Sequence, residues 1–431
     1  MDIAEIASLV GDDRVHARCY TDPAIFELEM ERIFRRTWNF ACHESQIPKS
    51  GDFVTMTIAR QPIIVARAPS GEVAAMFNRC SHRGSIVCRE ESGNAPNFTC
   101  PFHGWVFRCN GELAGIPYRE SYSPEFLAQT NLGLAPVPRL GRYRGFVFVS
   151  LSAEGVPFES YLAPLKVGID NLLDRAPEGE LIADNGLHRY AYKGNWKHQI
   201  ENGIDEYHPP FSHASTIKDG KQMARAYGSE GFHYTNKNEK SEDVGRSHFD
   251  HAEIHGFPYG HSYLTVADRS RVADLKVPSY RELLIKKHGE KRFAEVEEET
   301  FITNCVFYPN FILRVNNNIH LRVVRPIAVD RSEVWVWPLR FKGAPDDMSE
   351  GIMRYANVHT SVASFVQTDD LEVFERCQEG LNAQAPEWVW LARGLKQEKP
   401  GKHPGELVAQ GTWETGMRAQ FRYWKEMMTQ A

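Results

Sequence analysis

Two short segments of the sequence each combine one cysteine with one histidine. The first pair is Cys80-x-His82 and the second is Cys100-x-x-His103, separated by the 17 residues from 83 to 99. A structural zinc site usually divides its ligands into a cysteine pair and a histidine pair. Mixed pairs instead suit a two-iron cluster, in which two thiolates hold one iron and two imidazoles hold the other. The alternatives are a mononuclear zinc site or four unrelated polar side chains.

The two-iron arrangement is that of a Rieske [2Fe-2S] cluster. Gly84 and Gly104 give the backbone the freedom that tight ligand loops need. A Rieske centre passes electrons singly and makes no bonds in a substrate, so the larger remainder of the chain should have another task. The other cysteines are predicted to be reduced thiols rather than ligands: Cys19, Cys42, Cys88, Cys109, Cys305 and Cys377.

A second group of candidate ligands lies in the segment NWKHQIENGIDEYHPPFSH (195–213). Asp205, His208 and His213 could supply most of a mononuclear iron site, which leaves positions on Fe(II) for O2 and substrate chemistry. Two histidines five residues apart would point away from a common face of a continuous helix. Because Pro209 disfavours the α conformation in the residue before it, we expect the helix to end near His208 and the chain to turn there. The alternative is that both histidines are ordinary surface or core residues.

The segments CSHRG (80–84) and CPFHGW (100–105) resemble the Rieske domain of aromatic ring-hydroxylating oxygenases. The segment DEYHPPFSH (205–213) resembles the Asp-x-Tyr-His-x4-His signature of the same family. The resemblance implies that the cluster ligands are Cys80, His82, Cys100 and His103. It also implies that His208 and His213 bind the mononuclear iron, and that Asp205 hydrogen-bonds towards His103 of the partner subunit as a bridge for electrons.

The carboxylate ligand of the iron is expected in the segment SFVQTDDLEVFERCQEG (364–380). It offers Asp369 and Asp370, and the resemblance implies that Asp370, the second acid of the pair, is the ligand. The alternative is that the two acids cap the helix that follows, because carboxylates are favoured at a helix N-terminus. One of them could cap while the other binds.

These candidate ligands require two kinds of supporting structure. The segment 21–34 predicts a helix, with Thr21 or Asp22 as its cap, and short alternating segments from 51 to 152 predict a small antiparallel β domain. Beyond a linker at 152–158, segments 303–315, 319–329 and 332–341 predict strands, whereas 348–366 and 416–428 predict helices. The predicted fold class is α+β, with a small antiparallel β Rieske [2Fe-2S] domain and a larger catalytic domain whose antiparallel sheet is covered by helices.

Three domain ranges are predicted. They are 1–37 for an N-terminal helical segment packing on the catalytic domain, 38–155 for the Rieske domain and 156–431 for the catalytic mononuclear iron domain.

Composition narrows the possible partners. The 431 residues carry a formal net charge of -6 and no long Lys/Arg-rich cluster, which argues against nucleic-acid binding. No stretch approaches the ~18 apolar residues of a membrane span and the N-terminus lacks a secretory pattern, so a cytoplasmic protein without a membrane segment is expected. The segment from Lys218 to Arg246 is rich in Gly, Ser, Lys and Asn and is expected to be mobile.

The resemblance implies the α subunit of a Rieske non-haem iron dioxygenase that converts an arene to a cis-dihydrodiol with O2. Its cofactors would be a Rieske [2Fe-2S] cluster and mononuclear Fe(II). No G-x-G-x-x-G fingerprint occurs, so a partner ferredoxin or reductase would deliver electrons, with NADH as the ultimate donor. The relatives imply an α3β3 assembly with a small β subunit. The alternatives are a monooxygenase that hydroxylates or demethylates, and an electron carrier without oxygenase activity.

Few residues of the sequence indicate the substrate class. Naphthalene-type relatives carry Asn at the position of Glu201, and ENGIDEYH (201–208) is closer to the benzoate-type branch, which acts on aromatic carboxylates. Such a substrate would favour an arginine in the pocket, and Arg314 or Arg322 could line it from predicted strands. Either arginine could instead face solvent. Six further histidines fit no metal site by their spacing and are expected to be structural or solvent-facing: His198, His233, His248, His251, His255 and His261.

Overall fold

The computed structural model describes residues 2–129, 132–184, 186–214, 252–266, 278–298, 301–315, 319–361, 363–364 and 366–430. The segment 218–246, which was expected to be mobile, lies outside the described residues. The chain divides into two compact units. One unit is Phe34–Phe158, and the other combines Met1–Ile33 with Glu159–Ala431.

The smaller unit consists of short antiparallel strands. They are β2 (Asn39–His43), β3 (Asp52–Ile58), β4 (Gln61–Arg67), β5 (Val73–Phe77), β6 (Ser92–Asn94), β7 (Asn97–Thr99), β8 (Val106–Arg108), β9 (Leu113–Gly115), β10 (Arg139–Tyr143) and β11 (Phe146–Ser150). The described residues form sheets in the orders β10-β11-β2, β5-β4-β3-β6 and β7-β8-β9. The short helices are η2 (Glu44–Gln46), η3 (Arg119–Ser121) and α4 (Pro124–Leu127).

Strand β4 separates two hydrophobic cores in this unit. Its side chains alternate across the sheet, so Ile63 and Val65 enter one core while Ile64 enters the other. The first core packs against β11. The second contains Cys80 and Cys100. The candidate cluster loops are therefore anchored in a core of their own.

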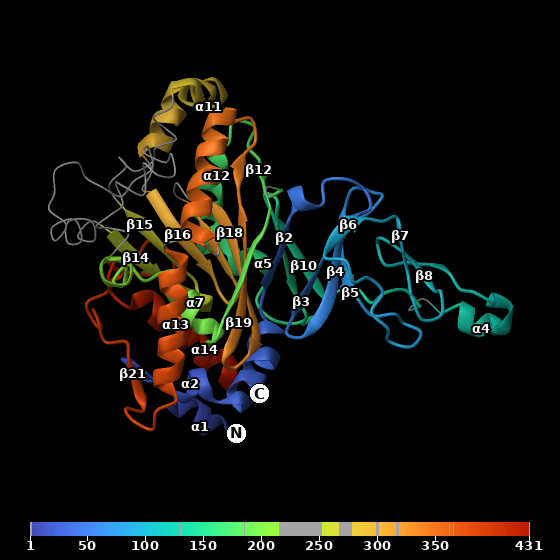
Figure 1. Ribbon diagram of the computed structural model, residues 1–431, viewed down its shortest axis with the longest axis horizontal. Helices are drawn as coiled ribbons and strands as arrows, with labels where there is room; N and C mark the ends of the chain where they lie inside the picture. The colour runs from blue at the N-terminus through green and yellow to red at the C-terminus, as the bar shows by residue number, and fades with distance from the viewer. Residues whose placement is uncertain are drawn as a thin grey trace. The chain divides into compact units, whose positions relative to one another are not determined.

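The larger unit is built on one antiparallel sheet. In the described residues its strands follow the order β13-β19-β18-β17-β16-β15-β14-β23-β22 (Figure 1). Their bounds are β13 (His188–Tyr192), β14 (Ala252–Gly256), β15 (Ser262–Val266), β16 (Phe301–Phe307), β17 (Phe311–Arg314), β18 (His320–Ala328), β19 (Arg331–Pro338), β22 (Lys399–Pro400) and β23 (Leu407–Gln410). Two short pairs lie outside it, β1 (Arg14–His16) with β21 (Trp388–Trp390) and β12 (Leu181–Ile182) with β20 (Arg340–Phe341).

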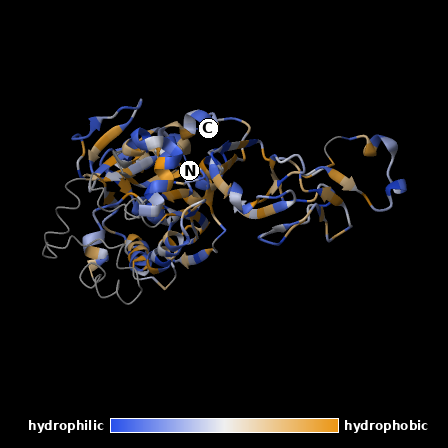
Figure 2. Cartoon of the chain, turned by 90° about the horizontal axis from the view of Figure 1, so that it is seen from above, coloured by the Kyte–Doolittle hydropathy of each residue, from blue (hydrophilic) through white to orange (hydrophobic). Residues whose placement is uncertain are grey.

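The larger unit also contains helices, which carry both hydrophobic and hydrophilic residues (Figure 2), and several of them contact this sheet. Their bounds are α1 (Ile3–Ser8), α2 (Arg18–Thr21), α3 (Pro23–Glu29), η1 (Met30–Phe34), α5 (Phe158–Leu162), η4 (Ala163–Leu165), α6 (Lys166–Asp174), α7 (Trp196–Asn202), α8 (Pro209–Ser212), η5 (Pro258–Gly260), α11 (Pro278–Glu298), α12 (Asp346–Thr360), α13 (Gln367–Leu381) and α14 (Thr415–Thr429). Helix α7 contacts β18, and α13 contacts both α7 and β13 (Figure 1). The predicted α+β class is confirmed. None of the helices in the described ranges has the length and apolar composition that a membrane span requires.

A buried carboxylate joins the N-terminal helix to the rest of the larger unit. Glu29 at the end of α3 has no exposed surface. Its Oε1 accepts hydrogen bonds from Lys197 Nζ at 2.5 Å and Trp424 Nε1 at 2.7 Å, and its Oε2 accepts one from Trp196 Nε1 at 2.8 Å. Because a buried charge is tolerated only when it is fully paired, these bonds fix α3, α7 and α14 against one another and hold the start of α7 in place.

Candidate metal centres

The two cysteine–histidine pairs lie in loops with the same backbone pattern. In each loop the cysteine N–H donates to the carbonyl five residues later, at 2.8 Å in both. The glycine four residues after the cysteine donates back to the cysteine carbonyl, at 2.9 Å for Gly84 and 3.1 Å for Gly104. Both glycines have positive φ angles, +76° and +71°, a region where a side chain would be strained. The sequence thus forms two equivalent turns that present Cys80 and Cys100 alike.

The side chains of these loops divide into a buried and an outer pair. Cys80 and Cys100 are each 2% exposed. His82 and His103 lie nearer the surface, with their ring centroids 4.7 Å apart. His82 stacks on the buried Trp105 at 5.0 Å and an interplanar angle of 3°. This division suits a two-iron cluster whose inner iron takes thiolates and whose outer iron takes imidazoles.

The pKa values of the two buried thiols shift in opposite directions, and burial raises that of Cys80. Burial also opposes the ionisation of Cys100, but backbone N–H groups of Phe102 and His103 and the side chains of Cys80 and Ser85 together lower the pKa of the Cys100 thiol. In the described part of the chain, the potential ligand atoms of three or more such side chains converge within 4.8 Å of one another at His208, His213 and Asp370, and not at these loops.

The second centre begins where α7 ends. The expectation of a helix continuing to about His208 is wrong, because α7 ends at Asn202 and the intervening residues form no helix. Pro209 and Pro210 instead begin the short helix α8. Proline is favoured in the first turn of a helix, where its missing N–H is not needed. His208 and His213 consequently flank a single turn and approach each other, with ring centroids 5.3 Å apart.

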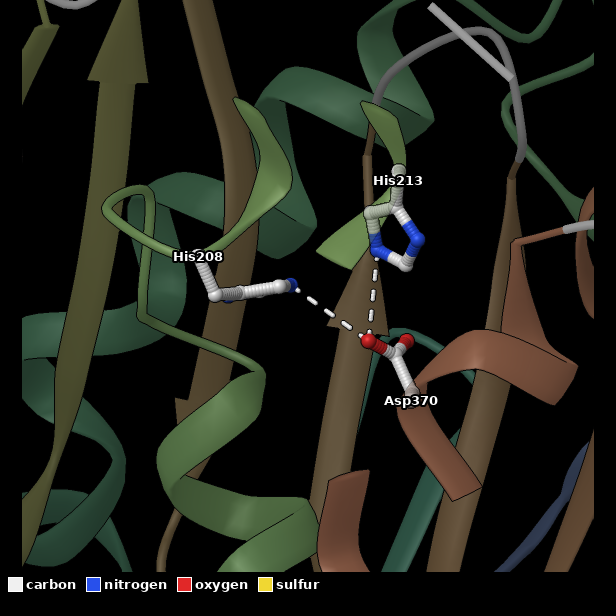
Figure 3. Close-up of side chains that lie close together, drawn as sticks. All are labelled: His208, His213 and Asp370. Atoms are coloured by element: carbon white, nitrogen blue, oxygen red, sulfur yellow. Dashed lines mark ion pairs between the residues drawn. The ribbon is translucent and has the colours of Figure 1, made fainter. Parts of the chain in front are cut away.

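The two imidazoles and one carboxylate converge on a common point. Nε2 of His208 lies 3.5 Å and Nε2 of His213 lies 3.2 Å from Oδ1 of Asp370 (Figure 3). All three ligand atoms lie within 4.8 Å of one another. Asp370 comes from the first turn of α13, 157 residues after His213 (370 - 213). Two imidazoles and one carboxylate on one side of a metal are the ligand set of non-haem Fe(II) oxygenases, so the residues fit that group.

Neighbouring polar side chains hold these three residues in place. Asn202 Nδ2 lies 3.2 Å from His208 Nε2 and donates to Asp370 Oδ1 at 3.1 Å. Oδ2 of Asp369 lies 3.2 Å from Nδ1 of His213. The side chain of Asp369 therefore meets the outer nitrogen of a candidate ligand, the arrangement that commonly orients metal-bound histidines. The sequence offered Asp369 as an alternative ligand or a helix cap and gave no role to Asn202.

Asp205 lies behind the other histidine. Its Oδ2 is 3.6 Å from His208 Nδ1, longer than a hydrogen bond, and its Oδ1 accepts one from the Tyr207 N–H at 2.6 Å. Burial opposes the charged imidazolium, but Asp205 and Asp370 together raise the pKa of His208 to about 10. Burial likewise opposes the carboxylate of Asp370, yet His208 and His213 hold its pKa well below the usual range. Without a metal, these carboxylates favour a proton on His208. A metal cation bound to His208 would take the place of that proton and release it.

A chain of hydrogen bonds leads from the sheet to the site. The Tyr190 hydroxyl of β13 donates to Gln199 Oε1 at 3.2 Å, and Gln199 Nε2 donates to Asn202 Oδ1 at 3.3 Å. Sequence reasoning missed this chain. The i, i+3 spacing of Gln199 and Asn202 on one helix face was the available signal, but the contact with Tyr190 depends on tertiary packing.

The remaining candidate residues have varied environments. Arg314 donates to Asn304 Oδ1 at 3.0 Å, and Arg322 is buried in β18. His198 and His261 are buried, and His255 lies 2.7 Å from Glu406. Outside the described residues lie His233, His248 and His251.

The chain is similar to known proteins in both of its units. The profile of the Rieske [2Fe-2S] domain matches residues 37–134, and that of the ring hydroxylating alpha subunit (catalytic domain) matches residues 180–430. The large subunit of anthranilate 1,2-dioxygenase from Acinetobacter baylyi is 34% identical over 90% of this chain and 81% of its own length. The large subunit of 2-halobenzoate 1,2-dioxygenase from Burkholderia cepacia is 33% identical over 89% of this chain and 80% of its own.

Solved structures resemble the chain over nearly its whole length. A naphthalene 1,2-dioxygenase mutant bound to phenanthrene superposes with a TM-score of 0.83 at 26% identity, covering 100% of this chain and 96% of that one. The naphthalene 1,2-dioxygenase from Rhodococcus sp. bound to indole has a TM-score of 0.81 at 25% identity, with 96% and 94% covered.

Proposed function

The chain belongs to the family of ring-hydroxylating dioxygenase α subunits, and we propose that it dihydroxylates an aromatic carboxylate to a cis-dihydrodiol. Its cofactors are a Rieske [2Fe-2S] cluster and a mononuclear iron. The reaction adds both atoms of O2 to two adjacent ring carbons and consumes two electrons and two protons. One ring double bond is lost and two C–O bonds are formed.

The convergence of His208, His213 and Asp370 is the observation that carries this proposal. It provides three potential protein ligands for one metal ion, and a ligand set of two histidines and one carboxylate leaves coordination positions on Fe(II) for O2 and substrate chemistry. The substrate class rests on similarity. Three relatives at 32 to 34% identity are named after anthranilate, 2-halobenzoate and toluate, each of which is an aromatic carboxylate.

Each candidate ligand has a defined task in the proposal. The cluster is held by Cys80, His82, Cys100 and His103, and the mononuclear iron by His208, His213 and Asp370. When bound, the iron supplies O2 activation and the cluster supplies electrons one at a time. The protein orients the iron ligands through Asn202 and Asp369, and Asp205 links His208 to His103 of the partner subunit. The partial exposure of Asp205, 25% of its side chain, leaves it open to such a contact.

The proposal includes partners for this chain. Electrons arrive from a ferredoxin or reductase, with NADH as the ultimate donor, and three copies assemble with a small β subunit as α3β3. The chain works in the cytoplasm, where its thiols stay reduced. In the described structure Cys80, Cys100 and the other cysteines form no disulfide.

Product analysis tests the proposed reaction. The reconstituted oxygenase is supplied with a chemical or enzymatic reductant, labelled O2, and a panel pairing benzoate-type acids with benzene and naphthalene. We expect dihydrodiols carrying two labelled oxygen atoms, formed faster from the acids. A product with one labelled atom would establish a monooxygenase instead. Cluster reduction without oxygen uptake on any substrate would favour the electron-carrier alternative.

A further inference from the structure

Arg322 is a buried arginine without a hydrogen-bonding partner among the described residues. The residue lies in β18, the third strand from the β13 edge of the large sheet in the described part of the chain, and is 9% exposed. Its Nε is enclosed by protein and has no acceptor among the described residues. By contrast Arg418, 4% exposed, binds Glu398 and the carbonyls of Leu391 and Arg393. A buried N–H group without an acceptor is costly, above all on a charged side chain, so a partner from outside these residues is expected.

The sheet register shows which way Arg322 faces. It lies directly opposite Ile312 in β17 and Val336 in β19, and directly opposed residues share one face of an antiparallel sheet. The Ile312 side chain lies against Gly203, at the end of α7, where an added Cβ would come within 2.8 Å of it. The other neighbour, Val336, packs in a cluster with Phe374 of α13. Arg322 therefore points towards the two helices that carry Asn202 and Asp370.

Tyr190 links this face to the metal site. It belongs to the same cluster as Val336 and Phe374, and its hydroxyl begins the hydrogen-bonded chain through Gln199. Burial raises the pKa of Tyr190, while the charge of Arg322 lowers it and that of Asp370 raises it. The guanidinium and the candidate iron ligand are thus both within electrostatic reach of one hydroxyl group.

We propose that Arg322 binds the carboxylate of the aromatic substrate and thereby selects acids over neutral arenes. This inference rests on the proposed function and adds the residue that recognises the substrate. A guanidinium can hold a carboxylate with two parallel N–H···O bonds, which would fix the ring orientation relative to the iron as well as its charge. Arg314 is the weaker choice because it already donates to Asn304.

Substitution of Arg322 in the complete oxygenase complex tests the inference. For Arg322→Gln we expect kcat/KM for benzoate to fall by at least about 100-fold, because truncating one member of a buried charged pair has an effect of this order. The kcat/KM for benzamide, which is similar in shape but neutral, should change only a few-fold. Arg322→Lys keeps the charge without the planar fork and should recover part of the loss.

A matched control lies on the same strand. Arg325 pairs with Glu333 at 2.8 Å and lies over the Trp335 ring. Arg325→Gln therefore removes a guanidinium of β18 that already has a carboxylate partner within the protein. The ratio of kcat/KM for benzoate to kcat/KM for benzamide should stay at the wild-type value. Equal losses for both acids and amides in Arg322→Gln would indicate a merely structural role and overturn the inference.

Thermal unfolding gives a readout that does not depend on turnover. Benzoate should raise the Tm of the wild-type complex more than benzamide does, and Arg322→Gln should abolish this difference while keeping the cluster spectrum. Because the substitution removes an unpaired buried charge, the ligand-free variant should be no less stable than the wild type. An unchanged preference for benzoate in the variant would overturn the role of Arg322 alone. Turnover of neutral arenes only, already in the wild type, would overturn the proposed substrate class as well.

Discussion

The two candidate metal centres differ in how the chain assembles them. The Rieske loops lie within residues 80–105, and each is shaped by its own backbone hydrogen bonds and one glycine of positive φ. The mononuclear site joins α8 to α13, which are far apart in the sequence and contact each other in the larger unit. The first centre is therefore a local structure, whereas the second depends on tertiary packing.

The difference extends to the surroundings of the ligands. At the loops, Cys80 and Cys100 are buried and the ring of His82 stacks on Trp105. At the second centre, each ring is faced by a carboxylate and the amide of Asn202 bridges two ligands. At the second centre a network of polar side chains positions the candidate ligands, whereas at the Rieske loops the backbone turns do so. Substitutions at the second centre should accordingly leave the first intact.

The largest effect is expected from Asp370→Ala. Removing one of three protein ligands should reduce iron from about three to about two per chain, because the cluster alone contains two irons. Product formation should fall by more than about 100-fold, beyond the effect usual for a residue that only orients a ligand. Iron analysis with the visible and EPR spectra of the cluster measures both. Glu379→Ala, at an exposed position of the same helix, is the control, and retention of the third iron in Asp370→Ala would refute the ligand assignment.

Asp205→Asn tests whether the two centres communicate. If Asp205 carries electrons between subunits, both metals should remain bound while turnover falls well beyond the roughly 10 to 100-fold loss that an orienting residue causes. Rapid mixing of the reduced complex with O2 and substrate should show the cluster staying reduced. A loss within the orienting range, with normal cluster oxidation, would limit Asp205 to holding His208.

Sequence reasoning reached the local features more readily than the tertiary ones. The loops could be predicted because ligand type, spacing and glycines lie in one short segment, and the convergence of His208, His213 and Asp370 follows the expected grouping, although their role as ligands stays a prediction. The helix end was wrong because Pro209 can begin a helix as well as stop one. Asn202 received no role from the sequence, and Arg322 could only be named beside Arg314 as a candidate partner of a carboxylate, since their contacts depend on how α7, α13 and β18 pack.

A smaller effect is expected from Asp369→Asn. The substitution keeps the size of the side chain but weakens its interaction with His213 Nδ1, so iron should be bound roughly 10 to 100-fold less tightly. Titration of the iron-depleted complex with Fe(II) measures this, and the cluster spectrum should not change. Asp370→Asn serves for comparison and should be the more severe of the two. Equal affinity in Asp369→Asn and the wild type would mean that the network does not orient His213.

The smallest expected effect concerns a partly buried acid near the second centre. Glu201 on α7 accepts a hydrogen bond from the Tyr20 hydroxyl at 2.8 Å, and burial raises its pKa from 4.5 to about 7, with a further contribution from Asp205. Because the pKa is higher in the folded state, the protonated acid stabilises the fold below about pH 4.5, and this contribution is lost as the pH rises through 7. Glu201→Gln should therefore increase stability at pH 8 by about 1 to 2 kcal/mol relative to wild type, and change it little at pH 5.

Thermal unfolding followed by circular dichroism of the helices measures the gain in stability. The bleaching of the cluster, which reports on the loop centre, should be unaffected. A gain of equal size at both pH values would show that the charge of Glu201 is not its source.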